Sequence, residues 1–484
     1  MAFDDQINEF FAPISKAVSD VIFYKVPIQV SGETFDLALI LIWLAAASIF
    51  LTFYFGFINI RFFKHSIDIL RGKGAFNTDK QEGQLNSFQA LATSLSGTVG
   101  LGNIGGVAVA VSTGGPGAVF WMAMMGLFGM SAKFAEATLG VKYRVHPDKE
   151  RPDIISGGPM YYIKAAFEKR NMSLIGSVLA AVFAICCIGG AIGAGNMFQA
   201  NQATQQLINV TGGEGSYFAD KSWIIGIILA ILVGAVIIGG LKTIAAVASK
   251  IVPMMGLLYL VAGLIVIILN IHNLIPSVII IFQMALTPEA GFGAILGALL
   301  IGVQRAAFSN EAGIGSAAIV HATARTNEPV TQGFVGMLGP FIDTIVICMV
   351  TALVIVITGV YDGSAGMEGV SLTSRAFESS ISWFPYVLAI TVFLFAYSTM
   401  IAWFYYGLKC LTYLTGEKPA VEMAYKVFFC LCVVVGASSA LENIIGFSDA
   451  ILFAMAIPNV IALYMLAPEL KKDLKDYVQK LERK

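Results

Sequence analysis

Long apolar stretches are the feature that most constrains how this chain can fold. Eleven of them approach the roughly 20 apolar residues that an α-helix needs to cross a bilayer. They are residues 37–60, 85–111, 118–141, 175–208, 223–241, 244–270, 293–321, 332–359, 384–413, 425–441 and 446–467. A further apolar stretch, 274–286, is too short to span, so we expect it to be interfacial or re-entrant. The pattern predicts an all-α polytopic membrane protein with about 11 transmembrane helices, because helices satisfy their own backbone hydrogen bonds in lipid.

Composition supports this class and excludes several others. Hydrophobic residues make up 57% of the chain and charged residues only 13%, with a mean hydropathy of +0.78, whereas soluble proteins carry about 25% charged residues. The six cysteines lie in or beside apolar stretches, which predicts buried thiols rather than disulfides. Four histidines without a Cys/His cluster argue against zinc. There is no phosphate-cradling loop, and we expect no cofactor and no nucleic-acid partner.

The distribution of Lys and Arg predicts the orientation. If the N-terminus is outside, 24 of the 30 basic residues fall in the loops or tail assigned to the cytoplasm and only four fall outside. This bias favours an N-terminus outside and a C-terminus in the cytoplasm. Residues 3–24 alternate apolar and polar side chains at helical spacing, so we expect an amphipathic surface helix there rather than a secretory signal.

Few ionisable side chains remain inside the predicted spans, where they are costly and usually functional or paired. They are Lys133, Glu136, Arg305, Glu311 and Asp343. Lys133 and Glu136 are three residues apart, which favours a structural pair. Arg305 and Glu311 have two interpretations: an internal ion pair, or a Glu311 that takes up H⁺ during transport.

The first of two glycine-rich stretches lies within residues 85–111. Positions 97–106 contain five glycines, surrounded by hydroxyl and amide side chains. Each glycine costs a helix up to about 1 kcal/mol relative to alanine. A helix broken at mid-membrane exposes amides that attract a carboxylate and carbonyls that ligate Na⁺. The alternative is close helix packing at Gly102 and Gly106, which have the small-xxx-small spacing.

The second stretch, residues 304–316, repeats the pattern within residues 293–321. The two broken helices are five helices apart in the predicted order, so they cross the membrane in opposite directions. Paired broken helices in two antiparallel halves are typical of inverted-repeat transporters. The two breaks therefore predict a polar substrate site near the middle of the membrane.

Three strings resemble the alanine/glycine:cation symporter family of prokaryotes: residues 96–106, residues 114–122 (Gly-Gly-Pro-Gly-Ala-Val-Phe-Trp-Met) and residues 304–315. Residues 99–103 also resemble the first-helix signature of neurotransmitter:sodium symporters. The resemblance implies a 5+5 inverted-repeat core preceded by one extra helix. It also implies uptake of alanine or glycine with Na⁺ or H⁺ across the plasma (inner) membrane.

The expected organisation has five parts: an N-terminal surface segment (1–36), a peripheral transmembrane helix (37–60), a first repeat (85–270), a second repeat (293–467) and a basic cytoplasmic tail (468–484).

The resemblance assigns roles in the substrate pocket. The backbone amides near Thr98, Gly100 and Gly102 are expected to bind the substrate carboxylate, and Asn103 either contacts the ammonium group or helps to hold an ion. Phe308 and Ser309 would line the opposite side. Trp403 would cap the substrate methyl group and limit its size, with Thr399 one turn away on the same face. Asn196 and Gln199 are pocket candidates, unless they belong to a helix end that emerges into water.

The coupling ion has its own expected site. Ser398 and Thr399, with carbonyls near Ser96 and Val99, would ligate Na⁺. The alternative role for the aromatic side chains between positions 395 and 407, above all Tyr405 and Tyr406, is to anchor the helix at the membrane interface.

The residues by themselves leave other functions possible. A transporter of the same fold for a nucleobase, a betaine or a larger amino acid is the nearest rival. A channel pore is usually built from several short subunits, and a membrane enzyme would need a catalytic constellation. None of the four histidines lies inside a span beside an acid, so we expect no enzyme activity.

Overall fold

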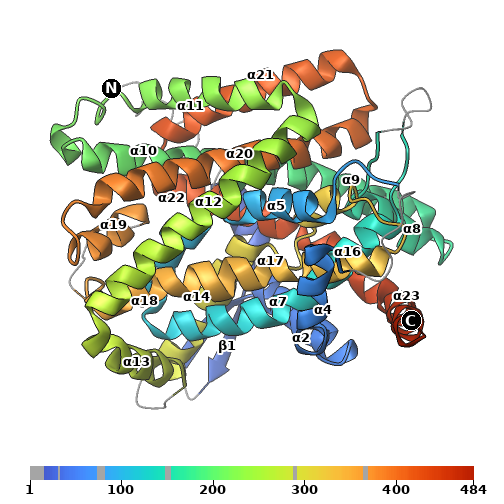
Figure 1. Cartoon of the computed structure of the whole chain (residues 1–484), viewed down its shortest axis with the longest axis horizontal. Coiled ribbons are helices and arrows are strands. Elements are labelled where there is room, and N and C mark those ends of the chain that lie inside the picture. Colours follow the sequence, from blue (N-terminus) through green and yellow to red (C-terminus); the bar gives the residue numbers. More distant parts are fainter. Residues whose placement is uncertain are drawn as a thin grey trace.

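Helices stacked roughly side by side make up most of the molecule (Figure 1). The computed structural model describes residues 13, 16–30, 33–73, 82–147, 154–286, 292–362 and 369–483. The elements of the first part are β1 (Lys25–Val30), β2 (Glu33–Ala38), α2 (Leu39–Tyr54), α3 (Ile58–Arg61), α4 (Phe63–Asp68), η1 (Ile69–Lys73), α5 (Ser87–Thr98), η2 (Gly102–Gly106), α6 (Val107–Gly114), α7 (Gly117–Lys142), α8 (Pro159–Glu168), α9 (Ser173–Ile192), η3 (Gly193–Met197), α10 (Phe198–Val210), η4 (Gly213–Gly215), α11 (Ser222–Ile237), α12 (Gly240–Leu269), η5 (Ile271–Asn273) and α13 (Leu274–Leu286).

The elements of the second part are α14 (Phe292–Asn310), α15 (Ser316–His321), α16 (Pro329–Gly336), α17 (Leu338–Pro340), η7 (Phe341–Cys348), α18 (Met349–Thr358), α19 (Val370–Glu378), α20 (Phe384–Thr415), α21 (Pro419–Ser438), α22 (Leu441–Ala454) and α23 (Ala456–Glu482). Several of them join into longer, nearly continuous helices: α9–η3–α10, α16–α17–η7–α18 and α22–α23.

In the described residues, seven helices are long and apolar enough to cross a membrane, or eight if the bent pair formed by residues 87–98 and 102–114 counts as one span. Three shorter apolar helices accompany them: Leu39–Tyr54, Ser222–Ile237 and Ile271–Leu286. The all-α membrane class is confirmed, whereas the count of eleven spans stays a prediction.

Both glycine-rich stretches interrupt a helix. A capping box at Asn86 and Gln89 begins α5, and α5 ends at Thr98, with an angle of 53° to the following helix. In the second stretch α14 continues as far as Asn310. Glu311, Gly313 and Gly315 then adopt left-handed backbone conformations, with φ angles of 56°, 86° and 95°. Glycine tolerates this conformation, but glutamate rarely adopts it without support from its surroundings.

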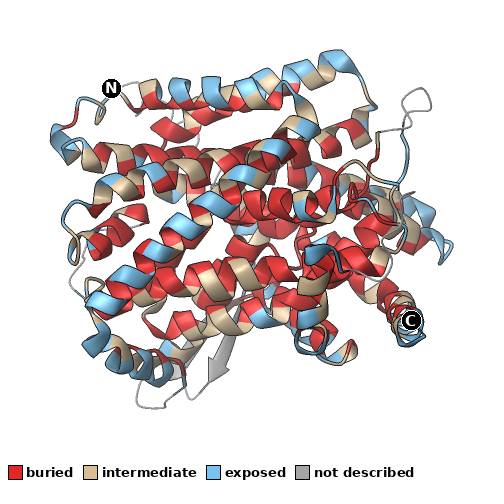
Figure 2. Cartoon of the chain, viewed as in Figure 1, coloured by how far each residue is buried: buried red, intermediate tan, exposed pale blue. Residues whose placement is uncertain are grey.

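The burial pattern separates a protein core from lipid-facing helices. Helices α5 and α7 are mostly buried and α14 is buried over most of residues 302–310, whereas α11, α12 and α13 present exposed outer faces (Figure 2). These faces are apolar; Leu257 and Ile268, for example, are more than 60% exposed. An exposed apolar face on a long helix is what contact with lipid requires. The two broken helices therefore lie in the centre of the bundle.

The N-terminal region differs from the expectation. β1 and β2 form an antiparallel two-stranded hairpin that the sequence pattern did not predict. Residues 16–22 are helical, in line with part of the expected amphipathic helix, while residues 3–12, 14 and 15 of that prediction lie outside the described residues. The first expected span is shorter than 37–60, because α2 ends at Tyr54 and Gly56 and Phe57 take left-handed conformations.

The segments next to the two broken helices meet at the side predicted to face the cytoplasm. Residues 82–85, before α5, pair in parallel with residues 323–326, after α15. The guanidinium group of Arg144 donates to the carbonyl oxygens of Glu82, Ala324 and Thr326 at 2.8–3.1 Å. The bundle is thus closed at this end by main-chain hydrogen bonds.

Candidate functional site at the broken helices

At the first break, two backbone amides donate to side-chain oxygens and not to carbonyl oxygens of a helix. The amide of Gly100 donates to Oδ1 of Asn103 at 2.8 Å, and that of Leu101 donates to Oε1 of Gln199 in α10 at 3.0 Å. Asn103 and Gln199 are both buried. The break therefore holds polar main-chain groups whose present partners are exchangeable side-chain oxygens, in a region closed to bulk water.

Two glycines bring other helices close to the break. A Cβ atom at Gly100 would overlap the hydroxyl group of Thr399 in α20 and lie 3.0 Å from Oε1 of Gln199. A Cβ atom at Gly102 would lie 3.3 Å from the ring of Phe308 in α14. The structure thus brings five of the predicted site residues, Gly100, Gly102, Gln199, Phe308 and Thr399, into direct contact.

The residues expected to hold Na⁺ are also neighbours. Oγ of Ser96 donates to the carbonyl oxygen of Ser398 at 2.6 Å, and Val99 directly follows the end of α5. Thr399 donates to the carbonyl oxygen of Phe395 at 2.9 Å, which leaves its oxygen lone pairs free for a cation. Hydroxyl and carbonyl oxygens are hard ligands of the kind that line Na⁺ sites at unwound helices.

Trp403 connects both breaks. Its indole nitrogen lies 3.1 Å from the carbonyl oxygen of Gly97 and 3.2 Å from a carboxylate oxygen of Glu311. The ring is buried, lies against the backbone of Gly195 and makes an edge contact with Tyr406. The expected interfacial alternative does not apply to these aromatics, because Tyr405 and Tyr406 are buried as well.

Asp343 is the site residue that the sequence interpretation missed. Its carboxylate accepts hydrogen bonds from Asn103 at 2.6 Å and from Ser309 and Thr344 at 2.8 Å each. Asn103 belongs to the first broken helix and Ser309 to the second, so one buried carboxylate joins both. Its position inside a predicted span was the only signal in the sequence, because two of its three partners, Asn103 and Ser309, come from distant segments.

The interpretation of Arg305 and Glu311 as an ion pair is wrong. Arg305 pairs with Asp449 of α22, and Gln304 donates to the same carboxylate at 2.7 Å. Glu311 instead accepts from Trp403 and Ser316. Because α14 stays helical to Asn310, residues six apart point about 120° away from each other around its axis, and Glu311 itself lies in the left-handed turn after the helix. The sequence could not show how far the helix continues.

Comparison with known proteins decides the family. Residues 23–484 match the sodium:alanine symporter family. The chain belongs to this family. It is 40% identical over 361 residues to the sodium/alanine symporter AgcS of Methanococcus maripaludis, which covers 74% of this chain and 76% of that protein. It is 35% identical over 362 residues to the probable sodium/glutamine symporter GlnT of Bacillus subtilis, covering 74% and 71%.

A solved structure supports the fold. MhsT in complex with L-phenylalanine matches with a TM-score of 0.55 at 16% identity, covering 80% of this chain and 90% of that one. The inverted-repeat fold is thereby confirmed, and the family match confirms the resemblance to the symporter family. The protein is an integral membrane, sodium-coupled amino-acid transporter and not an enzyme.

Buried polar groups of the symporter support the second break. Lys133 and Glu136 form the expected pair at 3.9 Å, and the Lys133 ammonium group also donates to the carbonyl oxygen of Glu311 at 3.1 Å. Asn459 of α23 donates to Glu136 and to the carbonyl oxygen of Gly313, both at 2.9 Å. The unwound backbone is thus held by side chains of two neighbouring helices.

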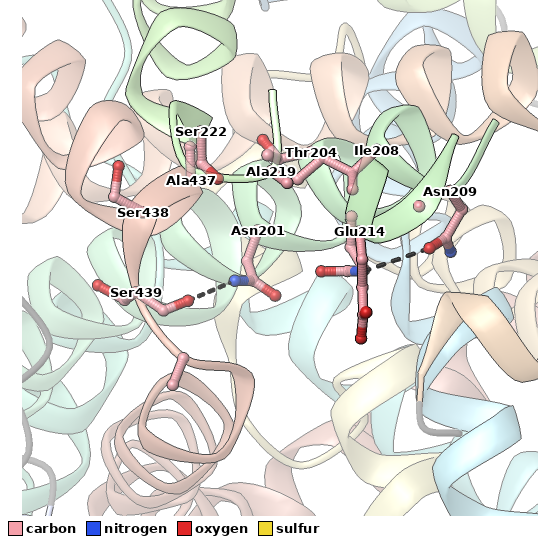
Figure 3. A pocket seen from close by; sticks show the side chains of 13 residues that line it. Asn201, Thr204, Ile208, Asn209, Glu214, Ala219, Ser222, Ala437, Ser438 and Ser439 are labelled. Carbon is pink, nitrogen blue, oxygen red and sulfur yellow. Dashed lines mark hydrogen bonds between the residues drawn. The ribbon is translucent and has the colours of Figure 1, made fainter. Parts of the chain in front are cut away.

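Two further features lie on α10 and on η3, which precedes it. Asn196 of η3 donates to the carbonyl oxygen of Phe429 in α21 at 2.7 Å, and in the described residues no hydrogen bond joins it to another predicted pocket residue. A separate cavity of about 480 Å³ lies at the far end of α10, lined by Asn201, Thr204, Glu214, Ser222, Ser438 and Ser439 among others (Figure 3). None of the predicted substrate residues lines this cavity.

Proposed function

We propose that this chain imports a small neutral amino acid, alanine or glycine, by alternating access, with the substrate bound between the two broken helices. The printed name of AgcS, a sodium/alanine symporter, supports this substrate. The name of GlnT makes a larger amino acid the chief alternative. We further propose that the protein lies in the prokaryotic plasma (inner) membrane with its N-terminus outside and its C-terminus in the cytoplasm.

The observation that carries the choice of a small substrate is the close approach at Gly100. Thr399 and Gln199 touch this glycine from two different helices, and Phe308 touches Gly102 two residues further on. Trp403, fixed by Gly97 and Glu311, closes the same region. A pocket walled in this way has room for a methyl group or a hydrogen atom better than for a long side chain.

The polar groups of the break suit a zwitterion. A substrate carboxylate would replace the Asn103 and Gln199 side chains as acceptor for the amides at Gly100 and Leu101, beside Thr98 and Gly102. Released Asn103 and the hydroxyl group of Ser309 would then contact the ammonium group. Exchange of one set of hydrogen bonds for another avoids leaving buried polar groups unpaired.

For the coupling ion we propose Na⁺ at Ser96, Val99, Ser398 and Thr399, with the Asp343 carboxylate and its neighbours as a second oxygen cluster of suitable chemistry. One Na⁺ moving down 100 mV contributes about 2.3 kcal/mol, and a tenfold gradient adds about 1.4 kcal/mol. Together these would sustain an alanine gradient on the order of several hundredfold. H⁺ carried by Glu311 is the alternative.

The test is uptake of radiolabelled alanine into proteoliposomes. One sample receives an inward Na⁺ gradient, and another receives an inward H⁺ gradient in Na⁺-free buffer. We expect saturable uptake with Na⁺ only, competed by glycine and not by glutamine. Uptake driven by H⁺ alone would overturn Na⁺ as the coupling ion and favour H⁺ carried by Glu311. Strong competition by glutamine would overturn the small-substrate proposal.

A further inference from the structure

A sharp turn follows α2 on the side of the molecule where the C-terminus lies. Gly56 and Phe57 take left-handed conformations, with φ angles of 65° and 55°, and the amide of Phe57 donates back to the carbonyl oxygen of Thr52 at 2.8 Å. A left-handed phenylalanine is rare and needs support from its surroundings. The turn redirects the chain from α2 into α3 and α4.

Large apolar side chains point outward at this turn. Phe53 is 60% exposed, Phe57 39% and Ile60 69%. In a membrane protein such side chains contact acyl chains. They therefore mark lipid-accessible surface immediately before the basic residues that follow.

Exposed basic side chains lie next to the apolar ones. Arg61 donates to the carbonyl oxygen of Gly56 at 3.3 Å and lies over the ring of Phe62, and Lys64 follows on α4. Lys471 of α23 places its ammonium group 4.3 Å from the ring centre of Tyr54, the last residue of α2. Arg61 and Lys471 thus meet at one end of α2 from two distant parts of the chain, and Lys64 follows Arg61 by three residues.

α23 is fixed against α4 at this place. The hydroxyl group of Tyr477 lies 3.0 Å from Nε2 of His65, and α2, α4 and α23 lie near the C-terminal end of the molecule (Figure 1). Lys471 therefore lies beside the turn because α23 packs against α4.

These basic residues differ from others nearby. Lys142 and Lys169 form ion pairs with Glu469, and Lys480 forms one with Glu328. Within the described residues no ion pair is found for Arg61, Lys64 or Lys471. Of the acidic residues on α4 and α23, Glu469 and Asp473 are paired with Lys142. The others, Asp68, Asp476 and Glu482, are outnumbered by the basic residues of α3, α4 and α23 that form no ion pair within the described residues, which are Arg61, Lys64, Lys471, Lys472 and Lys475. Unpaired cations at a membrane boundary attract anionic headgroups.

We propose that Phe53, Phe57, Ile60, Arg61, Lys64 and Lys471 form a binding site for an anionic phospholipid. The phosphate group contacts the three cations, and the acyl chains lie along the exposed apolar side chains. The combination selects a phospholipid over free phosphate, which needs no apolar surface, and over a zwitterionic lipid, whose headgroup carries a compensating cation. The inference depends on the membrane location and not on the transported substrate.

Lipid retention by the purified full-length protein tests this site. Immobilised protein is equilibrated with mixed micelles that contain radiolabelled phosphatidylglycerol or phosphatidylcholine, and the lipid retained per protein is counted. We expect the wild-type protein to retain phosphatidylglycerol in preference. The variant with Arg61→Gln, Lys64→Gln and Lys471→Gln is expected to lose at least about fivefold of this preference, since each basic residue near anionic lipid contributes about that factor.

The matched control removes three exposed lysines elsewhere, through Lys242→Gln, Lys250→Gln and Lys418→Gln, and is expected to keep the preference. Equal retention of the two lipids by wild type would overturn the proposal. So would equal losses in the two triple variants, because general surface charge would then explain the binding. Neither result bears on alanine uptake, which is measured separately.

Discussion

The indole N–H of Trp403 donates to a carboxylate oxygen of Glu311 over 3.2 Å, and the same nitrogen lies 3.1 Å from the carbonyl oxygen of Gly97. One side chain of α20 therefore connects the two broken helices. Because this contact joins both breaks, we expect a change at one break to affect the other. Trp403 therefore has two separable roles: its ring limits the size of the substrate in our proposal, and its N–H group donates the hydrogen bond to Glu311.

Two substitutions of Trp403 distinguish these roles. Trp403→Phe keeps an aromatic ring but removes the donor, and a hydrogen bond to a charged group contributes about 1.5–3 kcal/mol. We expect alanine affinity to fall by about tenfold or more with unchanged selectivity. Trp403→Ala should in addition admit larger side chains. Binding of a panel of amino acids to purified protein measures both, and a Trp403→Ala protein with wild-type selectivity would show that this ring does not limit substrate size.

Gly100 and Gly106 provide a matched pair within one glycine-rich stretch. A Cβ atom at Gly100 would overlap Thr399, whereas one at Gly106 meets no atom within 4 Å. Overpacking costs about 1–3 kcal/mol, so Gly100→Ala should reduce alanine uptake by about fivefold to a hundredfold. Gly106→Ala should leave uptake near wild type. Equal effects of the two substitutions would indicate that helix flexibility, and not close approach, explains the glycines.

Asp343 places a negative charge between the broken helices. Asp343→Asn keeps the size of the side chain but removes the charge that we propose assists Na⁺ binding. We expect the Na⁺ concentration for half-maximal alanine uptake to rise by about tenfold or more, since hydrogen bonds and ion contacts to a buried charge contribute about 1.5–3 kcal/mol. Asp473→Asn, at the predicted cytoplasmic surface, is the control. An unchanged Na⁺ dependence in Asp343→Asn would remove this carboxylate from ion coupling.

The pair formed by Arg305 and Asp449 is buried, with both side chains at most 3% exposed. Removal of one partner of a buried pair costs about 3–5 kcal/mol, because it leaves an uncompensated charge. Asp449→Asn should therefore lower the thermal unfolding temperature in detergent more than the double substitution Arg305→Met with Asp449→Leu. If the double variant is the less stable one, the pair contributes net stability to the fold.

How far the sequence predicts this molecule depends on the range of the interactions involved. The breaks follow from local glycine content, and the contacts of Gly100, Gly102, Phe308 and Thr399 follow from the fold that the family implies. The Asp343 cluster, the pairing of Arg305 with Asp449 and the hydrogen bond of Asn196 to Phe429 join segments more than 30 residues apart. Such contacts depend on tertiary packing, and no spacing along the chain encodes them.

Arg144 bridges the two paired segments at the closed end of the bundle. Its guanidinium group donates to three carbonyl oxygens of the two paired segments, residues 82–85 and 323–326, and a Cβ atom at Gly83 would overlap the backbone of Arg325. Arg144→Ala removes charge-assisted hydrogen bonds that hold these segments together. We expect the amides of Leu85, Arg325 and Thr326 to exchange with deuterium at least about tenfold faster, since about 1.4 kcal/mol of lost closure corresponds to that factor.

Hydrogen exchange followed by mass spectrometry measures this opening directly, with Arg375→Ala as the control. Arg375 is an exposed residue in a pair with Glu378 on α19, so its loss should leave exchange in both segments unchanged. Faster exchange confined to the paired segments in Arg144→Ala would mean that the arginine sets how often this end opens. Unchanged exchange would mean that the main-chain hydrogen bonds alone keep this end of the bundle closed. The close approach of Gly83 to the backbone of Arg325 would then be the next contact to test.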